Sequence, residues 1–185
     1  TSLEPVVGDP DSDFALKNEH LPIIFDQYEK LADMLIEGID KDENFVFYHY
    51  MIDLDNGPCV YKRISGCGSG TEYMAVTPTG ELYPCHQFVG NKEFKIGDLD
   101  RGIERNDLIE DFKGCNAYSR KECQDCWAKL YCSGGCAANS YNATGSIEGV
   151  YDYQCKIFRK RIEMAIAVKI HEYMKEAQED KEVIA

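Results

Sequence analysis

Nine cysteines dominate this sequence, and every one of them lies after residue 58. Four fall within a short stretch, in the pattern Cys123-x2-Cys126-x5-Cys132-x3-Cys136. Thiolates bind soft centres such as zinc and iron–sulfur clusters, so four thiols at this spacing predict a metal-binding region. A disulfide scaffold fits less well, because the number of cysteines is odd and the first 58 residues contain none.

The net charge of the chain argues against two classes of binding partner. The 33 acidic and 20 basic residues give a net charge of −13. Nucleic acids and anionic membranes both attract basic surfaces, so we expect neither as a partner. No apolar run has the length of a membrane span, and we expect a cytoplasmic protein. Because the first residues already resemble regular structure, we interpret the chain as a fragment of a longer protein.

The first 56 residues predict a strand, a helix and a second strand. Apolar residues recur at helical spacing over residues 21–39, and Pro22 suits the first turn of such a helix. A strand interrupted by a proline is expected at residues 1–7. The aromatic run at residues 45–50 predicts the second strand. This order indicates a βαβ unit from a larger α/β domain.

The cysteine region contains one hairpin signal. Residues 72–77 and 81–83 flank Pro78-Thr79-Gly80, where glycine supplies the backbone angles of a tight turn. The rest of the cysteine region has no clear periodicity, so we expect it to bury little apolar surface. Such a region needs crosslinks or bound metal to be stable. From Phe158 to Met174 apolar residues repeat every four positions, which predicts a C-terminal helix followed by a frayed tail from Lys175 onward.

The cysteines alone leave the identity of the metal open, since eight of them could serve two zinc ions. The spacer at residues 133–135, Ser-Gly-Gly, favours clusters, because glycines let backbone N–H groups approach inorganic sulfide. His86 is a candidate ligand or proton donor, and we expect it to hydrogen-bond to a cluster sulfide. Trp127 is expected to pack over a cluster.

The pattern Cys67-x12-Gly80-x4-Cys85, followed by the four-cysteine stretch and then Cys155, resembles the SPASM domain. That domain extends radical S-adenosylmethionine enzymes that modify peptides. The stretches Cys59-Val-Tyr-Lys-Arg-Ile-Ser-Gly-Cys67, Tyr83-Pro-Cys85-His-Gln-Phe and Cys126-Trp-Ala-Lys-Leu-Tyr-Cys132 are further similar to maturases of SCIFF peptides. Those peptides are small, cysteine-rich and ribosomally made, and they receive thioether crosslinks.

The resemblance implies an α+β fold with three parts. Residues 1–56 would be the last strand–helix units of a partial (β/α) radical barrel. Residues 57–160 would be a loop-rich SPASM domain with a β-hairpin and two auxiliary clusters. Residues 161–185 would be a C-terminal helix and tail.

The resemblance also implies two [4Fe–4S] clusters with distinct ligands. Auxiliary cluster I would be held by Cys67, Cys85 and Cys136. Its fourth position would be either Cys59 or an open site that takes a cysteine of the peptide substrate. Auxiliary cluster II would be held by Cys123, Cys126, Cys132 and Cys155. Cys115 fits neither set, and we interpret it as a buried thiol or an exchangeable ligand.

The Cys-x3-Cys-x2-Cys motif of the radical-generating cluster is missing from this sequence, because Cys132-x3-Cys136 is followed by Asn139. The chain is therefore predicted to be inactive alone, with S-adenosylmethionine and a third [4Fe–4S] cluster in a missing N-terminal part. The resemblance implies thioether formation in a cysteine-rich precursor peptide, which would be a partner together with the rest of the enzyme. Two alternatives stay open: a sulfatase-maturase-like SPASM enzyme, and a non-catalytic binding module stapled by zinc.

Overall fold

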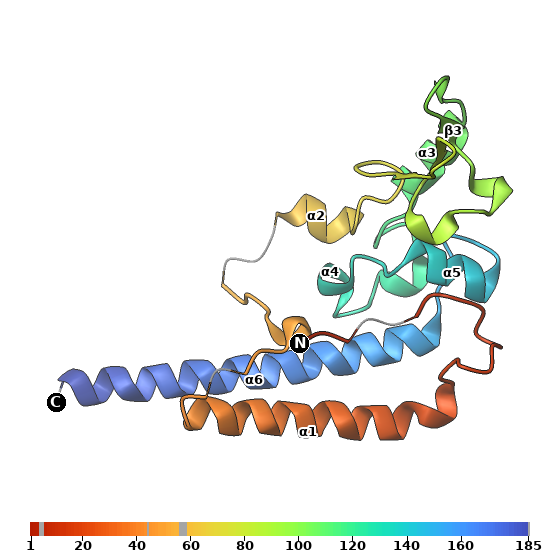
Figure 1. Cartoon of the computed structure of the whole chain (residues 1–185). Helices are drawn as coiled ribbons and strands as arrows, with labels where there is room; N and C mark the ends of the chain where they lie inside the picture. The colour runs from red at the N-terminus through yellow and green to blue at the C-terminus, as the bar shows by residue number, and fades with distance from the viewer. Residues whose placement is uncertain (4–5, 44, 56–58, 185) are drawn as a thin grey trace. The chain divides into compact units, whose positions relative to one another are not determined.

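The computed structural model describes residues 1–3, 6–43, 45–55 and 59–184, shown in Figure 1. The chain forms two compact units. The first comprises Thr1–Val6, Leu16–Gly57 and Asp152–Ala185, and the second comprises Val7–Ala15 and Pro58–Tyr151. The expected boundary between residues 56 and 57 lies outside the described residues, and the division into three parts stays a prediction. Within the described ranges, no helix is long and apolar enough to cross a membrane.

Two long helices form the frame of the first unit. Helix α1 spans Leu21–Asp40, which confirms the helix predicted from periodicity, with Pro22 in its first turn. A short 3-10 helix, η1 (Asn18–His20), precedes it. Helix α6 spans Asp152–Ile184, so it begins before Cys155 and continues through the segment where a frayed tail was expected.

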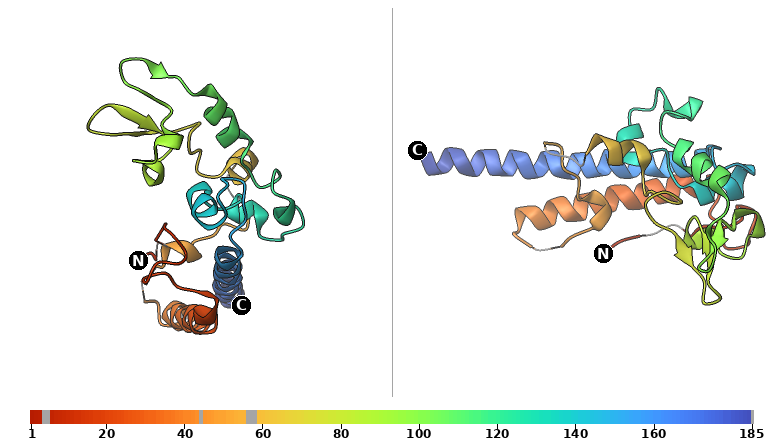
Figure 2. Two further views of the ribbon diagram at one scale, coloured as in Figure 1. Left: turned by 90° about the vertical axis from the view of Figure 1, so that its right-hand side faces the viewer. Right: turned by 90° about the horizontal axis from the view of Figure 1, so that it is seen from above.

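The two helices lie side by side and run in the same direction, as Figures 1 and 2 show. Side-chain contacts between the two helices follow this order. Lys160 of α6 contacts Glu29 at 2.5 Å, and further along both helices His171 contacts Asp40 at 2.7 Å. The facing surfaces bury a common core. Its members are Tyr28, Ala32, Leu35, Phe47, Tyr50, Ala165 and Val168.

The strand predicted at residues 45–50 is wrong. The segment ends in a 3-10 helix, η2 (Tyr48–Tyr50). A strand would point Phe47 and Tyr50 to opposite faces, whereas the helical turn buries both rings in the core, edge to face at 4.9 Å. Tyr50 also donates a hydrogen bond to the backbone oxygen of Tyr28 at 2.9 Å. Burial of two aromatic rings on one side therefore overrides the strand propensity.

The start of the chain meets this segment without forming a strand in the described residues. The Tyr48 N–H donates to the Thr1 carbonyl at 2.8 Å, and the Thr1 amino group donates to the Val46 carbonyl at 2.9 Å. Residues 4–5 of the expected first strand lie outside the described ranges. The described residues thus contain no βαβ unit and do not show the barrel that the resemblance implied.

The second unit contains a small antiparallel sheet in the order β1-β2-β3-β4. Strands β1 (Ala75–Val76) and β2 (Glu81–Tyr83) confirm the predicted hairpin, with Ala75 opposite Tyr83. Gly80 has a φ of 84° in the connecting turn and donates its N–H to Thr77 at 2.9 Å. Strands β3 (Gly97–Asp98) and β4 (Gly102–Ile103) were not predicted, because two-residue strands carry no readable alternation.

Short helical segments complete the second unit. The α-helices are α2 (Val60–Ser65), α3 (Asn106–Gly114), α4 (Lys129–Cys132) and α5 (Ala137–Thr144). The 3-10 helices are η3 (His86–Phe88), η4 (Lys92–Phe94) and η5 (Lys121–Cys123). Phe88, Phe94 and Phe112 form a small aromatic core, with the first two ring centroids 4.2 Å apart. The sequence did not indicate this core, because its rings come from separate turns without a common period.

Candidate metal centre

Three cysteines predicted to share a cluster lie at the ends of three different elements of the second unit; we call them site I. Cys67 follows helix α2 and is exposed. Cys85 follows strand β2 and is 5% exposed. Cys136 directly precedes helix α5 and is partly buried. The hairpin, the loop after α2 and the start of α5 thus each contribute one thiol.

Tyr73 lies near the three thiols of site I. Burial raises the pKa of Tyr73 most, and the neighbouring Cys85, Cys67 and Cys136 raise it further. Burial also raises the pKa of Cys136, as do the neighbouring Cys85 and Cys67, while backbone N–H groups at the start of α5 act in the opposite direction. Because such effects require proximity, the three thiols lie in the neighbourhood of Tyr73, and their binding of one common cluster stays a prediction.

A second group of thiols, site II, consists of Cys123, Cys126 and Cys132. Cys123 ends η5, and the N–H of Cys126 donates to its carbonyl at 3.1 Å, so a tight turn joins the pair. Burial raises the pKa of Cys123, and the nearby Cys126 raises it too, whereas the charge of Arg120 lowers it. Cys132 ends helix α4. Cys155, the fourth predicted ligand of cluster II, lies on α6 in the first unit and stays a predicted ligand.

The loop between Cys132 and Cys136 connects the two sites through an unusual backbone. Ser133, Gly134 and Gly135 have φ angles of 57°, 87° and 84°, so three consecutive residues are left-handed. L-residues avoid this region, which explains the two glycines. A Cβ on Gly134 would collide with the guanidinium of Arg120, whereas one on Gly135 would meet open space. The loop therefore fixes the positions of its two flanking thiols.

Arg120 holds this loop in place and was not identified from the sequence. Arg120 is buried, with 3% of its surface exposed. It donates to the carbonyls of Gly134, Glu148 at 3.1 Å and Ile147 at 2.7 Å, and to the Cys115 sulfur at 3.0 Å. No motif marks such a residue, because three of its four acceptors are backbone carbonyls distant in the sequence.

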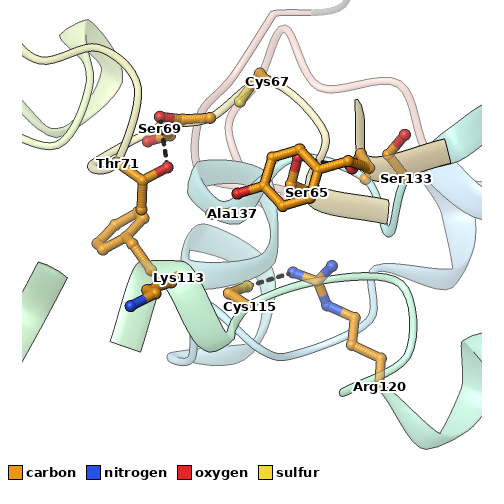
Figure 3. A pocket seen from close by; sticks show the side chains of 13 residues that line it. Ser65, Cys67, Ser69, Thr71, Lys113, Cys115, Arg120, Ser133 and Ala137 are labelled. Atoms are coloured by element: carbon orange, nitrogen blue, oxygen red, sulfur yellow. Dashed lines mark hydrogen bonds between the residues drawn. The ribbon is translucent and has the colours of Figure 1, made fainter. Parts of the chain in front are cut away.

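A pocket in the second unit opens beside these groups, as Figure 3 shows. Cys67 and Cys115 both line it, together with Arg120 and residues next to Cys136. The remaining lining residues are Tyr61, Ser65, Gly68, Ser69, Thr71, Phe112, Lys113 and Ser133. Cys115, which fitted neither predicted ligand set, thus lies beside site I.

The other candidates from the sequence lie at the surface. Cys59 is exposed at the start of α2. His86 hydrogen-bonds to the neighbouring Gln87 at 3.1 Å in an exposed position, and its bond to a cluster sulfide stays a prediction. Trp127 is 56% exposed, so its expected packing over a cluster also stays a prediction.

The thiols fit an iron–sulfur cluster by their chemistry and their setting. Among the described residues, no three histidine, cysteine, aspartate or glutamate side chains are grouped closely enough to hold a single metal ion. Site I nevertheless offers three soft donors near Tyr73, of which Cys67 lines the pocket and Cys136 follows the glycine-rich loop. Soft thiolates with nearby backbone N–H groups are the surroundings that clusters use.

Comparison with known proteins agrees with this chemistry. Residues 67–127 match SPASM, an iron–sulfur cluster-binding domain. The match includes the pair Cys67 and Cys85 from site I and the pair Cys123 and Cys126 from site II. It also includes Cys115, and it ends before Cys132.

Two curated relatives share about half of this chain. A serine-type anaerobic sulfatase-maturating enzyme of Klebsiella aerogenes is 33% identical over 94 residues, which cover 49% of this chain and 22% of the relative. The enzyme of the same name from Klebsiella pneumoniae is 32% identical over 94 residues with the same coverage. The aligned part of the chain thus spans about a fifth of the length of these relatives.

Proposed function

We propose that this chain is the auxiliary iron–sulfur portion of a radical S-adenosylmethionine maturase that modifies a peptide or protein. One observation carries the proposal: Cys67 and Cys85 of site I lie, together with Cys123 and Cys126 of site II, inside a segment that matches a cluster-binding domain. The names of the relatives support maturation as the kind of reaction. The radical-generating motif would belong to another part of the enzyme.

The chain's own residues would hold two [4Fe–4S] clusters and fix their positions. Cluster I would take the thiols of site I, and cluster II would take the thiols of site II with Cys155. When bound, the clusters accept and pass on electrons during oxidation of the substrate. The left-handed loop between Cys132 and Cys136 sets the spacing of the two sites, and Arg120 holds that loop.

Two substrate classes are compatible with this role. The cysteine-containing stretches resemble thioether-forming maturases, which favours a cysteine-rich precursor peptide as the substrate. The relatives are named serine-type sulfatase-maturating enzymes, which favours oxidation of a serine or cysteine side chain instead. Mass spectrometry of peptides treated with the complete enzyme separates the two. A thioether crosslink joins the cysteine sulfur to a second residue, so the two residues stay linked on fragmentation, whereas side-chain oxidation leaves no crosslink even where it consumes a thiol.

The first test is the metal content of the chain after anaerobic purification and reconstitution. Two clusters predict about eight irons and eight acid-labile sulfides per chain. Cys132→Ala, in site II, should lower both by about four, with exposed Ser2→Ala in the first unit as a control for handling losses. A colourless protein with about two zinc ions and no sulfide would instead identify a zinc-stapled module and refute the proposal.

A further inference from the structure

The thiol of Cys115 is held in a polar environment of the second unit. It accepts a hydrogen bond from Arg120 at 3.0 Å and donates one to the Ile147 carbonyl at 3.1 Å. Figure 3 shows the guanidinium directed at this sulfur and Cys67 on the same pocket. Cys115 therefore differs from a thiol that simply fills an apolar core.

Arg120 lacks an anionic partner among the described residues. Its acceptors there are three carbonyl oxygens and the Cys115 sulfur, and no ion pair to a carboxylate is found. Buried charges are normally paired, because an isolated one loses its hydration without compensation. A thiolate at Cys115 would provide the missing negative charge at 3.0 Å.

Loss of the Cys115 proton would leave no buried polar group unsatisfied. The Ile147 carbonyl, which accepts from the thiol, also accepts from Arg120 at 2.7 Å. The sulfur would keep its hydrogen bond from the same guanidinium. Arg120 therefore holds Cys115 through its sulfur atom, which is the atom that binds iron.

Cys115 also lies close to site I. It lines the pocket together with Cys67 and with Gly135 and Ala137, the two residues that flank Cys136 in the sequence. Burial raises the pKa of Cys115, as do the neighbouring Glu148, Cys67 and Cys136, whereas the charge of Arg120 lowers it. Cys59, the other available thiol, is exposed at the start of α2 and is absent from the described lining of this pocket.

We propose that Cys115 is the fourth cysteine ligand of the cluster held by Cys67, Cys85 and Cys136, with Arg120 pairing its thiolate. The inference rests on the proposed function, since it assigns one ligand of a cluster that the function requires. It replaces both Cys59 and the open position as the fourth ligand of the resting site. Arg120 then acts as a positioning residue.

The test compares Cys115→Ala with Cys59→Ala in the reconstituted chain, in buffer without added thiols. Electron paramagnetic resonance of the reduced protein should show one wild-type cluster signal lost or changed in Cys115→Ala and both signals unchanged in Cys59→Ala. Addition of a small thiol such as ethanethiol should restore the changed signal, which repair of a packing defect would not do. Unchanged signals in Cys115→Ala, or a change in Cys59→Ala alone, would overturn the inference.

A second measurement on the wild-type chain covers the case in which Cys115→Ala does not fold. Alkylation followed by peptide mapping should modify Cys115 at least about tenfold more slowly with clusters than after their removal, as it does Cys85, because a metal-bound thiolate is protected. Exposed Cys59 should react equally in both states. Equal reaction of Cys115 in both states, in a chain that contains the expected iron, would refute this inference alone. A wild-type chain without iron would refute the proposed function itself.

Discussion

In the first unit two long helices bury a continuous apolar face, whereas the second unit wraps short turns around a few aromatic rings and eight of the nine cysteines. The first unit follows a period that is visible in the sequence. The second needs left-handed backbone at several positions, including three in succession at residues 133–135. The comparison suggests that apolar packing stabilises one unit and ligand binding stabilises the other.

Removal of the metal should produce the largest difference in stability between the two units. Because metal-binding energy is folding energy in a poorly cored region, loss of the clusters should raise amide exchange in residues 67–140 by at least about tenfold. Exchange in α1 and in the part of α6 that packs on it should change little. Hydrogen exchange with mass spectrometry, before and after treatment with oxidant and chelator, measures both regions in one sample. Equal loss of protection in the two regions would contradict the comparison.

A core substitution in the first unit should have the opposite effect: it should destabilise the helices and leave the iron content unchanged. Leu35 is 6% exposed within the α1–α6 core, so Leu35→Ala should lower the free energy of unfolding by about 2–5 kcal/mol. The neighbouring Met34 is 64% exposed and provides the matched control, since Met34→Ala removes little buried surface. Denaturant titration followed by helical circular dichroism measures the effect. Iron content should be the same in both variants, and a loss of iron specific to Leu35→Ala would show that the units depend on each other.

Substitutions of the two glycines test whether Arg120 holds the loop between the two sites. Gly134→Ala and Gly135→Ala both place an L-residue at positive φ, which costs about 1–2 kcal/mol each. Only the Cβ at residue 134 collides with Arg120, so Gly134→Ala should also displace the guanidinium and the loop. We expect a larger loss of iron and stability in Gly134→Ala than in Gly135→Ala. Similar losses in the two variants would mean that backbone strain alone matters and that Arg120 does not hold the loop.

The same contrast explains how far the sequence could predict the structure. Helix α1 and the hairpin at Gly80 were predictable, because periodicity and turn chemistry are local signals. The helical turn at Tyr48–Tyr50 was not predictable, since its reason is burial of two rings against α1 and the distant α6 in the folded chain. The role of Arg120 was not predictable from the sequence either. Its role depends on carbonyls at residues 134, 147 and 148 that only the folded chain brings within reach.

The smallest expected effect concerns the ion pairs that join the two helices. Lys175 of α6 contacts Asp42 and the Ile39 carbonyl, both at 2.6 Å, at the end of α1. The hydrogen bond with Asp42 raises the pKa of Lys175 above its ordinary value of 10.5, which opposes the smaller effect of burial. A raised pKa means that the charged form is favoured by folding. The resulting stability is complete below pH 10.5 and is lost as the pH rises through the higher value of the folded state.

Lys175→Met should therefore lower the melting temperature slightly at neutral pH and by less at strongly alkaline pH. Lys30→Met is the matched control, because Lys30 pairs with Asp26 within α1 and does not join the helices. Thermal melting followed by circular dichroism at neutral pH and above pH 10.5 measures the difference between each variant and the wild type. The effect should stay small, since exposed ion pairs contribute little compared with buried apolar surface. A large effect at neutral pH would mean that charge rather than packing holds α1 to α6.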